Sequence, residues 1–297
     1  MKKLALIVIF LLVGVAIIVI HPNFSGNERT PSSSPNVEEQ GTEPELESEP
    51  LISNNHTVLY IGHSFGKIFA DTLEDHAEMA GVTNHIGYRV TSGDRSGAPD
   101  ALWEDTRDLN QIKAYLDTGE IDVLIMICCS VEFIESSYQS DLAVWNFTSY
   151  AVEKNPEIRI GLAMPWKDFP AEYDNGTEYR NQTDIAYDGW VNLSANLSSD
   201  FPATQVFTIN HGAVMYDLRD MFEAGDLGDD VEDLIGGANT SIFRDEKGHA
   251  GQIGIDTGTL VWLHAVYGIE PITTPEFEQY EFDIRQIAQN VISEGNQ

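Results

Sequence analysis

Short apolar runs rich in Val and Ile alternate with longer amphipathic stretches from residue 57 onward. This alternation is typical of a parallel sheet whose strands are joined by crossover helices. The expected strands are the runs at 58–61, 86–90, 123–129, 158–164 and 205–209. The sequence therefore predicts a three-layer α/β/α sandwich around a central, mostly parallel five-stranded sheet, with ligands bound at the carboxyl ends of the strands.

The stretches between these strands predict the helices. Apolar residues recur at helical spacing from Phe65 to Ala80, and Gly81 is a typical helix stop. Further helices are expected at 101–116, within 142–153, at 184–197, as one or two short helices within 214–234, at 250–267 and at 275–292. The polar stretch from Lys167 to Gln182 is rich in Tyr, Asp and Gly, and it is expected to be a long loop.

The first 54 residues differ in composition from the rest. Residues 1–20 hold two lysines and then 17 apolar residues, about the minimum that spans a bilayer. Residues 21–54 are rich in Glu, Pro and Ser and predict a disordered acidic linker, which leaves 55–297 as the folded domain. No small-x-small cleavage site follows Ile20, which favours a membrane anchor over a signal peptide. The lysines before the apolar run place the domain outside the cytoplasm, or secreted if the segment is cleaved.

Charge and missing motifs narrow the function classes. The formal net charge is −32, and such a surface repels nucleic acid, so no nucleic-acid partner is expected. Metal and nucleotide motifs do not occur in the sequence, which predicts no metal and no cofactor. The two cysteines, Cys128 and Cys129, are adjacent, so a bridge between them would be strained. We expect a monomer that contacts the membrane through its N-terminal helix.

The turn Gly62-His63-Ser64-Phe65-Gly66 lies where the first strand passes into the first helix. Such a turn exposes a serine hydroxyl at the carboxyl end of a strand, with its N–H at a helix N-terminus that stabilises an oxyanion. The pattern fits the Gly-x-Ser-x-Gly elbow of α/β-hydrolases, although that elbow follows several strands. The other interpretation is an ordinary N-cap serine.

The same turn resembles the first block of the SGNH/GDSL hydrolase superfamily, in which the serine directly follows the first strand. The segment from Ser92 to Gly97 is similar to the second block, and the resemblance implies Gly97, or else Gly93, as the glycine of the oxyanion hole. The third block departs from the family, because Ser130 stands where an asparagine donates to the oxyanion.

Residues Asp245 to His249 resemble the last block of the superfamily, Asp-x-x-His before a helix. The resemblance implies His249 as the base, oriented by a carboxylate that fixes its tautomer. The family spacing favours Glu246, while Asp245 lies one residue further back and has the commoner acid type. His211 follows the fifth strand and is expected as a substrate contact at the edge of the site.

These expectations combine into an extracytoplasmic serine hydrolase that cleaves ester bonds by a Ser-His-acid mechanism. Its substrate would be a small-molecule or polysaccharide ester, either a carbohydrate O-acyl ester or a lipid ester. The alternative is a non-catalytic surface protein that retains the hydrolase fold and binds glycans or partners, which the altered third block favours.

Overall fold

The computed structural model has a central sheet of five strands, as the sequence predicts. The structure describes residues 56–93, 97–127 and 138–295, which belong to one compact unit, Glu49–Gln297. The strands are β1 (Thr57–Gly62), β2 (Ile86–Thr91), β3 (Val123–Ile127), β4 (Arg159–Ala163) and β5 (Val206–Ile209). They lie in the order β2-β1-β3-β4-β5, and each neighbouring pair is parallel.

The strand order reverses direction at β1, because β2 lies on one side of β1 and β3 lies on the other. Chain connections leave the sheet toward opposite faces at such a point and open a crevice at the carboxyl ends of the strands. Ser64 directly follows β1. The topology therefore puts the serine turn where an open α/β sheet binds its ligands.

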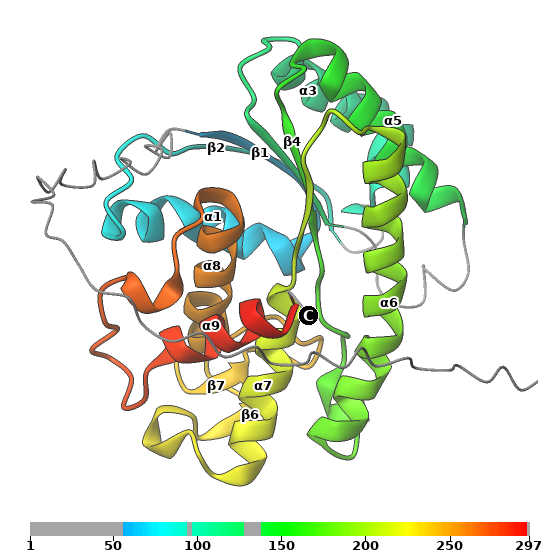
Figure 1. The fold of residues 1–297 in the computed structure, drawn as a ribbon. Coiled ribbons are helices and arrows are strands. Elements are labelled where there is room, and N and C mark those ends of the chain that lie inside the picture. The colour runs from blue at the N-terminus through cyan, green and yellow to red at the C-terminus, as the bar shows by residue number, and fades with distance from the viewer. Residues whose placement is uncertain (1–55, 94–96, 128–137, 296–297) are drawn as a thin grey trace, which may run out of the picture. The chain divides into compact units, whose positions relative to one another are not determined.

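Helices cover both faces of the sheet (Figure 1). One face is covered by α1 (Ser64–Met79), α7 (His211–Ala224), α8 (Gln252–Tyr267) and α9 (Ile284–Gly295). The other face is covered by α2 (Pro99–Glu104), α3 (Thr106–Leu116), α5 (Tyr138–Lys154) and α6 (Gly176–Asp200). A second, two-stranded parallel sheet is formed by β6 (Asp233–Ile235) and β7 (Ser241–Phe243), and short 3-10 turns lie at Pro170–Glu172, Gly228–Asp230 and Pro271–Thr273.

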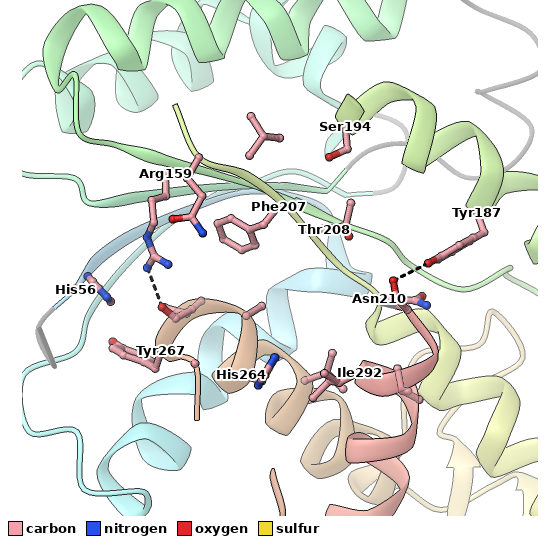
Figure 2. Close-up of a pocket in the computed structure, with 18 residues that line it drawn as sticks. His56, Arg159, Tyr187, Ser194, Phe207, Thr208, Asn210, His264, Tyr267 and Ile292 are labelled. Atoms are coloured by element: carbon pink, nitrogen blue, oxygen red, sulfur yellow. Dashed lines mark hydrogen bonds between the residues drawn. The ribbon is translucent and has the colours of Figure 1, made fainter. Parts of the chain in front are cut away.

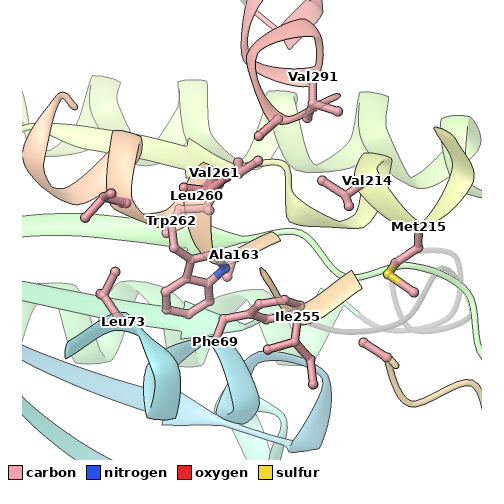
Figure 3. Packing of buried hydrophobic residues seen from close by; sticks show 14 of the residues in the cluster. Phe69, Leu73, Ala163, Val214, Met215, Ile255, Leu260, Val261, Trp262 and Val291 are labelled. Carbon is pink, nitrogen blue, oxygen red and sulfur yellow. The ribbon is translucent and has the colours of Figure 1, made fainter. Parts of the chain in front are cut away.

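Successive residues of the central strands point to opposite cores. In β1, Val58 and Tyr60 face the α1/α8 side, and Leu59 and Ile61 face the α2/α5 side. All four side chains are buried, which explains why the sequence of this parallel strand is a continuous apolar run. On the first side, Trp262 of α8 packs against Phe69 of α1 (Figure 3).

Four helix predictions differ from the structure. The helix expected at 101–116 is broken at Asp105, whose side chain accepts from two backbone N–H groups and starts α3 as an N-cap. The expected loop from Lys167 to Gln182 ends early, because Asn175 caps α6 and the helix begins at Gly176. The stretch 214–234 contains most of α7 and one 3-10 turn, and its last two residues begin the strand β6. The C-terminal helix begins at Ile284 and not at Pro275.

The predicted membrane anchor at 1–20 and the linker at 21–54 lie outside the described residues. Among the helices that the structure describes, none is both long and apolar enough to cross a bilayer.

Candidate active site

The serine turn places Ser64 at the first position of α1. The N-cap of that helix is His63, whose Nδ1 accepts from the backbone N–H of Phe65 at 3.4 Å. Ser64 therefore does not serve as the cap, and its Oγ lies 2.9 Å from Nε2 of His249 instead. The two segments that the sequence resemblance brought together, 185 residues apart, do meet at one rim of the sheet.

The two glycines of the turn make room for a buried tyrosine beneath it. The hydroxyl of Tyr60 donates to the carbonyl oxygen of His63 at 2.8 Å, and burial raises the pKa of Tyr60, so it stays a donor. A Cβ added to Gly62 or to Gly66 would lie 2.5 or 2.4 Å from this hydroxyl oxygen. The Gly-x-Ser-x-Gly pattern is thus explained by packing under the turn.

We expect Gly66→Ala to lower the free energy of unfolding by about 2 kcal/mol, as overpacking of a filled site does. Elsewhere in a helix the same change stabilises, because Ala is the better helix former. Combining it with Tyr60→Phe removes the contacted oxygen and should recover part of the loss. A double-mutant cycle in urea measures this coupling, and strictly additive effects would contradict the packing explanation.

The acid beside His249 is Asp245, which corrects the prediction that favoured Glu246. Oδ2 of Asp245 lies 2.7 Å from Nδ1 of His249. Its Oδ1 accepts from the backbone N–H groups of Gly248 and His249, each at 3.1 Å. The turn from Asp245 to His249 brings the carboxylate against the imidazole four residues later. The side chain of Glu246 is exposed and lines a different pocket.

The environment of Asp245 keeps it ionised. Burial alone would raise its pKa, but hydrogen bonds from the backbone and ring of His249, with that of Gly248, hold the pKa below its ordinary value. A carboxylate at Nδ1 keeps the ring proton on that nitrogen, so Nε2 is left to accept from the hydroxyl of Ser64. The row Ser64–His249–Asp245 has the geometry that activates a serine nucleophile.

An aromatic support fixes the loop that carries His249. Trp166, three residues after the end of β4, donates from Nε1 to the carbonyl oxygen of Gly248 at 2.7 Å. The ring of Phe65 stacks on Trp166 with centroids 4.7 Å apart, and its edge contacts His249. Gly248 has a φ of 96°, which a residue with a side chain rarely adopts. The support explains how a loop holds the imidazole steadily over the serine.

The two glycines predicted for the oxyanion hole, Gly97 and Gly93, differ in the space around their Cα atoms. A Cβ added to Gly97 would lie 2.6 Å from the carbonyl oxygen of Gly62 and 2.6 Å from Cβ of His63. Gly97 therefore packs directly against the serine turn. A Cβ added to Gly93 would meet no atom of the described residues within 4 Å. The structure favours Gly97, and Ser130 lies outside the described residues.

His211 does not lie at the open edge of the site, which corrects the prediction of a substrate contact. Its side chain is fully buried, with the two ring nitrogens each 3.3 Å from a carbonyl oxygen, that of Ile209 and that of Phe65. The ring packs against Phe69 and Trp262. Because α7 begins with this residue and folds over the sheet, His211 supports the serine turn from below.

Burial lowers the pKa of His211 to about 3, from an ordinary 6.5. Below about pH 6.5 the unfolded chain binds a proton at His211 and the folded chain does not. The contribution of the neutral buried ring to stability is therefore fully present above about pH 6.5 and is lost as the pH falls. We expect the free energy of unfolding to fall by about 2 kcal/mol between pH 7.5 and pH 5 because of His211. Urea unfolding at both values should show a smaller loss for His211→Gln, and an unchanged loss would contradict the assignment.

A separate pocket of about 610 Å³ lies along the free edge of β5 (Figure 2). Its lining includes Arg159, Phe207 and Tyr267. None of the predicted site residues that the structure describes lines it, so it is distinct from the row Ser64–His249–Asp245. Among the described residues, no group of three or more His, Cys, Asp or Glu side chains is placed to hold a metal ion.

The fold and this row of side chains define an α/β protein with a serine, a histidine and an aspartate in contact at the carboxyl end of its first strand. No family model matches the chain, and no curated protein matches it in sequence. A solved structure described as a DUF4886 family protein from Bacteroides uniformis is similar, with 17% identity and a TM-score of 0.54. The match covers 82% of this chain and 96% of that one.

Two further solved structures are looser matches. One is a Slackia heliotrinireducens chain whose description assigns it to the SGNH hydrolases, with 14% identity, a TM-score of 0.47 and coverage of 71% and 99%. The other is described as a lipase/acylhydrolase from Enterococcus faecalis, with 11% identity, a TM-score of 0.42 and coverage of 72% and 96%. The description of the Slackia chain names the superfamily that the serine and histidine segments resemble in sequence.

Proposed function

We propose that the protein hydrolyses ester bonds with Ser64 as nucleophile, His249 as base and Asp245 as the orienting acid. The observation that carries this proposal is the pair of contacts at His249, 2.9 Å to the serine hydroxyl and 2.7 Å to the carboxylate. The neighbouring folds support an acyl-transfer chemistry of this kind.

The reaction proceeds by two acyl transfers. Oγ of Ser64 attacks the ester carbonyl carbon while its proton passes to Nε2 of His249. Backbone N–H groups of Ser64 and Gly97 stabilise the oxyanion, and collapse of the intermediate breaks the ester C–O bond as His249 protonates the departing alcohol. Water, deprotonated by His249, then attacks the acyl carbon, and the bond to Oγ breaks as His249 returns the proton to Oγ, which releases the acid and restores Ser64.

The topology favours this assignment over the α/β-hydrolase alternative. Ser64 follows the first strand of the sheet, whereas the elbow of that fold follows several strands. The two glycines that suggested an elbow are explained by the packing of Tyr60.

A fluorophosphonate probe tests the proposal. The wild-type protein should be labelled at Ser64, and Ser64→Ala and His249→Ala should not be labelled. A folded wild-type protein that takes up no probe would contradict the hydrolase and favour the non-catalytic binding protein.

We also propose that residues 1–20 anchor the domain outside the cytoplasm. The support is the 17-residue apolar run that follows two lysines. Protease added to intact cells should digest the domain, and protection from that protease would contradict this location.

A further inference from the structure

A pocket of about 390 Å³ adjoins the loop that carries the catalytic acid. Its lining is Phe169, Ala171, Glu172, Ile235 and Glu246, and we name it the Phe169 pocket. Glu246 directly follows Asp245 in the chain, so this pocket lies on the acid side of the Ser64–His249–Asp245 row. None of its lining residues has a part in the proposed proton transfer.

Phe169 is an exposed aromatic side chain on a rigid loop. It is 43% exposed, although its loop is held firmly. The backbone N–H of Phe169 donates to the carbonyl oxygen of Lys247 at 3.0 Å. The buried Arg219 donates to the carbonyl oxygens of Pro170 and Tyr173 at 2.7 and 2.9 Å. A preorganised ring of this kind binds a ligand without the entropy cost of ordering a loop.

The side chains that line the Phe169 pocket indicate the chemical class of its ligand. Besides the aromatic ring, the described residues of the lining supply two carboxylates and no cationic side chain. Carboxylates accept strong hydrogen bonds from hydroxyl groups and repel anions. The apolar C–H face of a sugar ring fits an aromatic face, and the hydroxyl groups at its edge fit the acceptors.

We propose that the Phe169 pocket binds an uncharged sugar unit of the substrate. The inference rests on the proposed function, because it assigns the pocket to the alcohol part of a carbohydrate ester. The ester sits at Ser64, which contacts Nε2 of His249, whereas the pocket is lined by the residue that follows Asp245, the contact of Nδ1. The substrate therefore has to extend past His249, which makes it an acylated oligosaccharide or polysaccharide.

Phe169→Ala is the informative variant, because it removes the ring. Phe169→Tyr retains the aromatic face, and Ile272→Ala removes an apolar side chain that is also 43% exposed but lies outside the pocket. The full-length protein and these variants are applied to an array of neutral oligosaccharides, acidic oligosaccharides and cationic amino-sugar oligosaccharides. Hydrolysis of 4-nitrophenyl acetate, which is too small to reach the pocket from Ser64, is measured in parallel.

We expect the wild type to retain neutral oligosaccharides, and Phe169→Ala to bind them at least about tenfold more weakly. Phe169→Tyr and Ile272→Ala should bind as the wild type does, and Phe169→Ala should hydrolyse 4-nitrophenyl acetate within about twofold of it. Retention should persist in 0.5 M NaCl, because no charge pairs with a neutral sugar.

Three results would overturn the inference: no neutral oligosaccharide retained, retention that Phe169→Ala does not weaken, or retention of cationic probes alone that salt abolishes. If the wild type does not hydrolyse 4-nitrophenyl acetate yet retains neutral glycans through Phe169, the sugar site stands and the proposed hydrolase activity fails. The two failures are therefore distinguishable.

Discussion

Replacing Asp245 with Asn is expected to lower kcat/KM for a nitrophenyl ester by roughly 10⁴-fold. An amide at this position no longer holds the proton on Nδ1 of His249, so Nε2 loses its place as the acceptor from Ser64. It also no longer stabilises the imidazolium that forms when the serine proton is taken. Steady-state kinetics measure the effect, which should fall mainly on kcat, because Asp245 does not touch the substrate.

Glu246→Gln is the matched variant, because it makes the same change one residue away. Its side chain is exposed and does not contact the imidazole, so we expect a loss below roughly tenfold. Equal losses at the two positions, or a larger loss at Glu246, would show that the acid has been assigned to the wrong residue.

Replacing Gly97 with Ala should lower the same rate by roughly 100- to 1000-fold, the usual effect of losing one oxyanion donor. The added Cβ would lie 2.6 Å from the carbonyl oxygen of Gly62 and 2.7 Å from that of Ser92. Both contacts are with backbone, which cannot rotate away, so the chain has to move apart beside Ser64. The N–H of Gly97 then leaves its place at the oxyanion.

Gly93→Ala provides the control for this change. A Cβ at Gly93 meets no atom within 4 Å in the part of the chain that the structure describes, so the rate should stay within about threefold of the wild type. Circular dichroism establishes that both variants are folded. A normal rate in folded Gly97→Ala would remove Gly97 from the oxyanion site.

The sheet could be predicted from the sequence because its signal is local. A strand buried on both faces needs an apolar residue at every position, and the runs at 58–61 and 123–127 show this pattern, with every residue buried. Helix ends were harder to predict. The caps at Asp105 and Asn175 lie in polar stretches where Asp and Asn are common, so composition did not mark them.

Ser64 and His249 were predicted from short motifs at the ends of a strand and a loop. Their partners could not be predicted in this way. Spacing favoured Glu246, but a carboxylate meets the imidazole only if the turn folds back, and two backbone hydrogen bonds at Oδ1 of Asp245 decide that. Nothing local distinguished the buried His211 from a histidine at the rim.

By itself, the sequence determined the alternation of strands and helices, the acidic character of the domain, and the two segments that carry the serine and the histidine. These follow from side-chain periodicity, charge and residue type, which act over a few neighbouring residues. Only the tertiary structure decided that Asp245 and not Glu246 contacts His249, that Gly97 packs against the serine turn, and that Phe169 is exposed on the loop bonded to Lys247. Each of these depends on atoms that lie far apart in the chain and meet only when the sheet and its covering helices are packed.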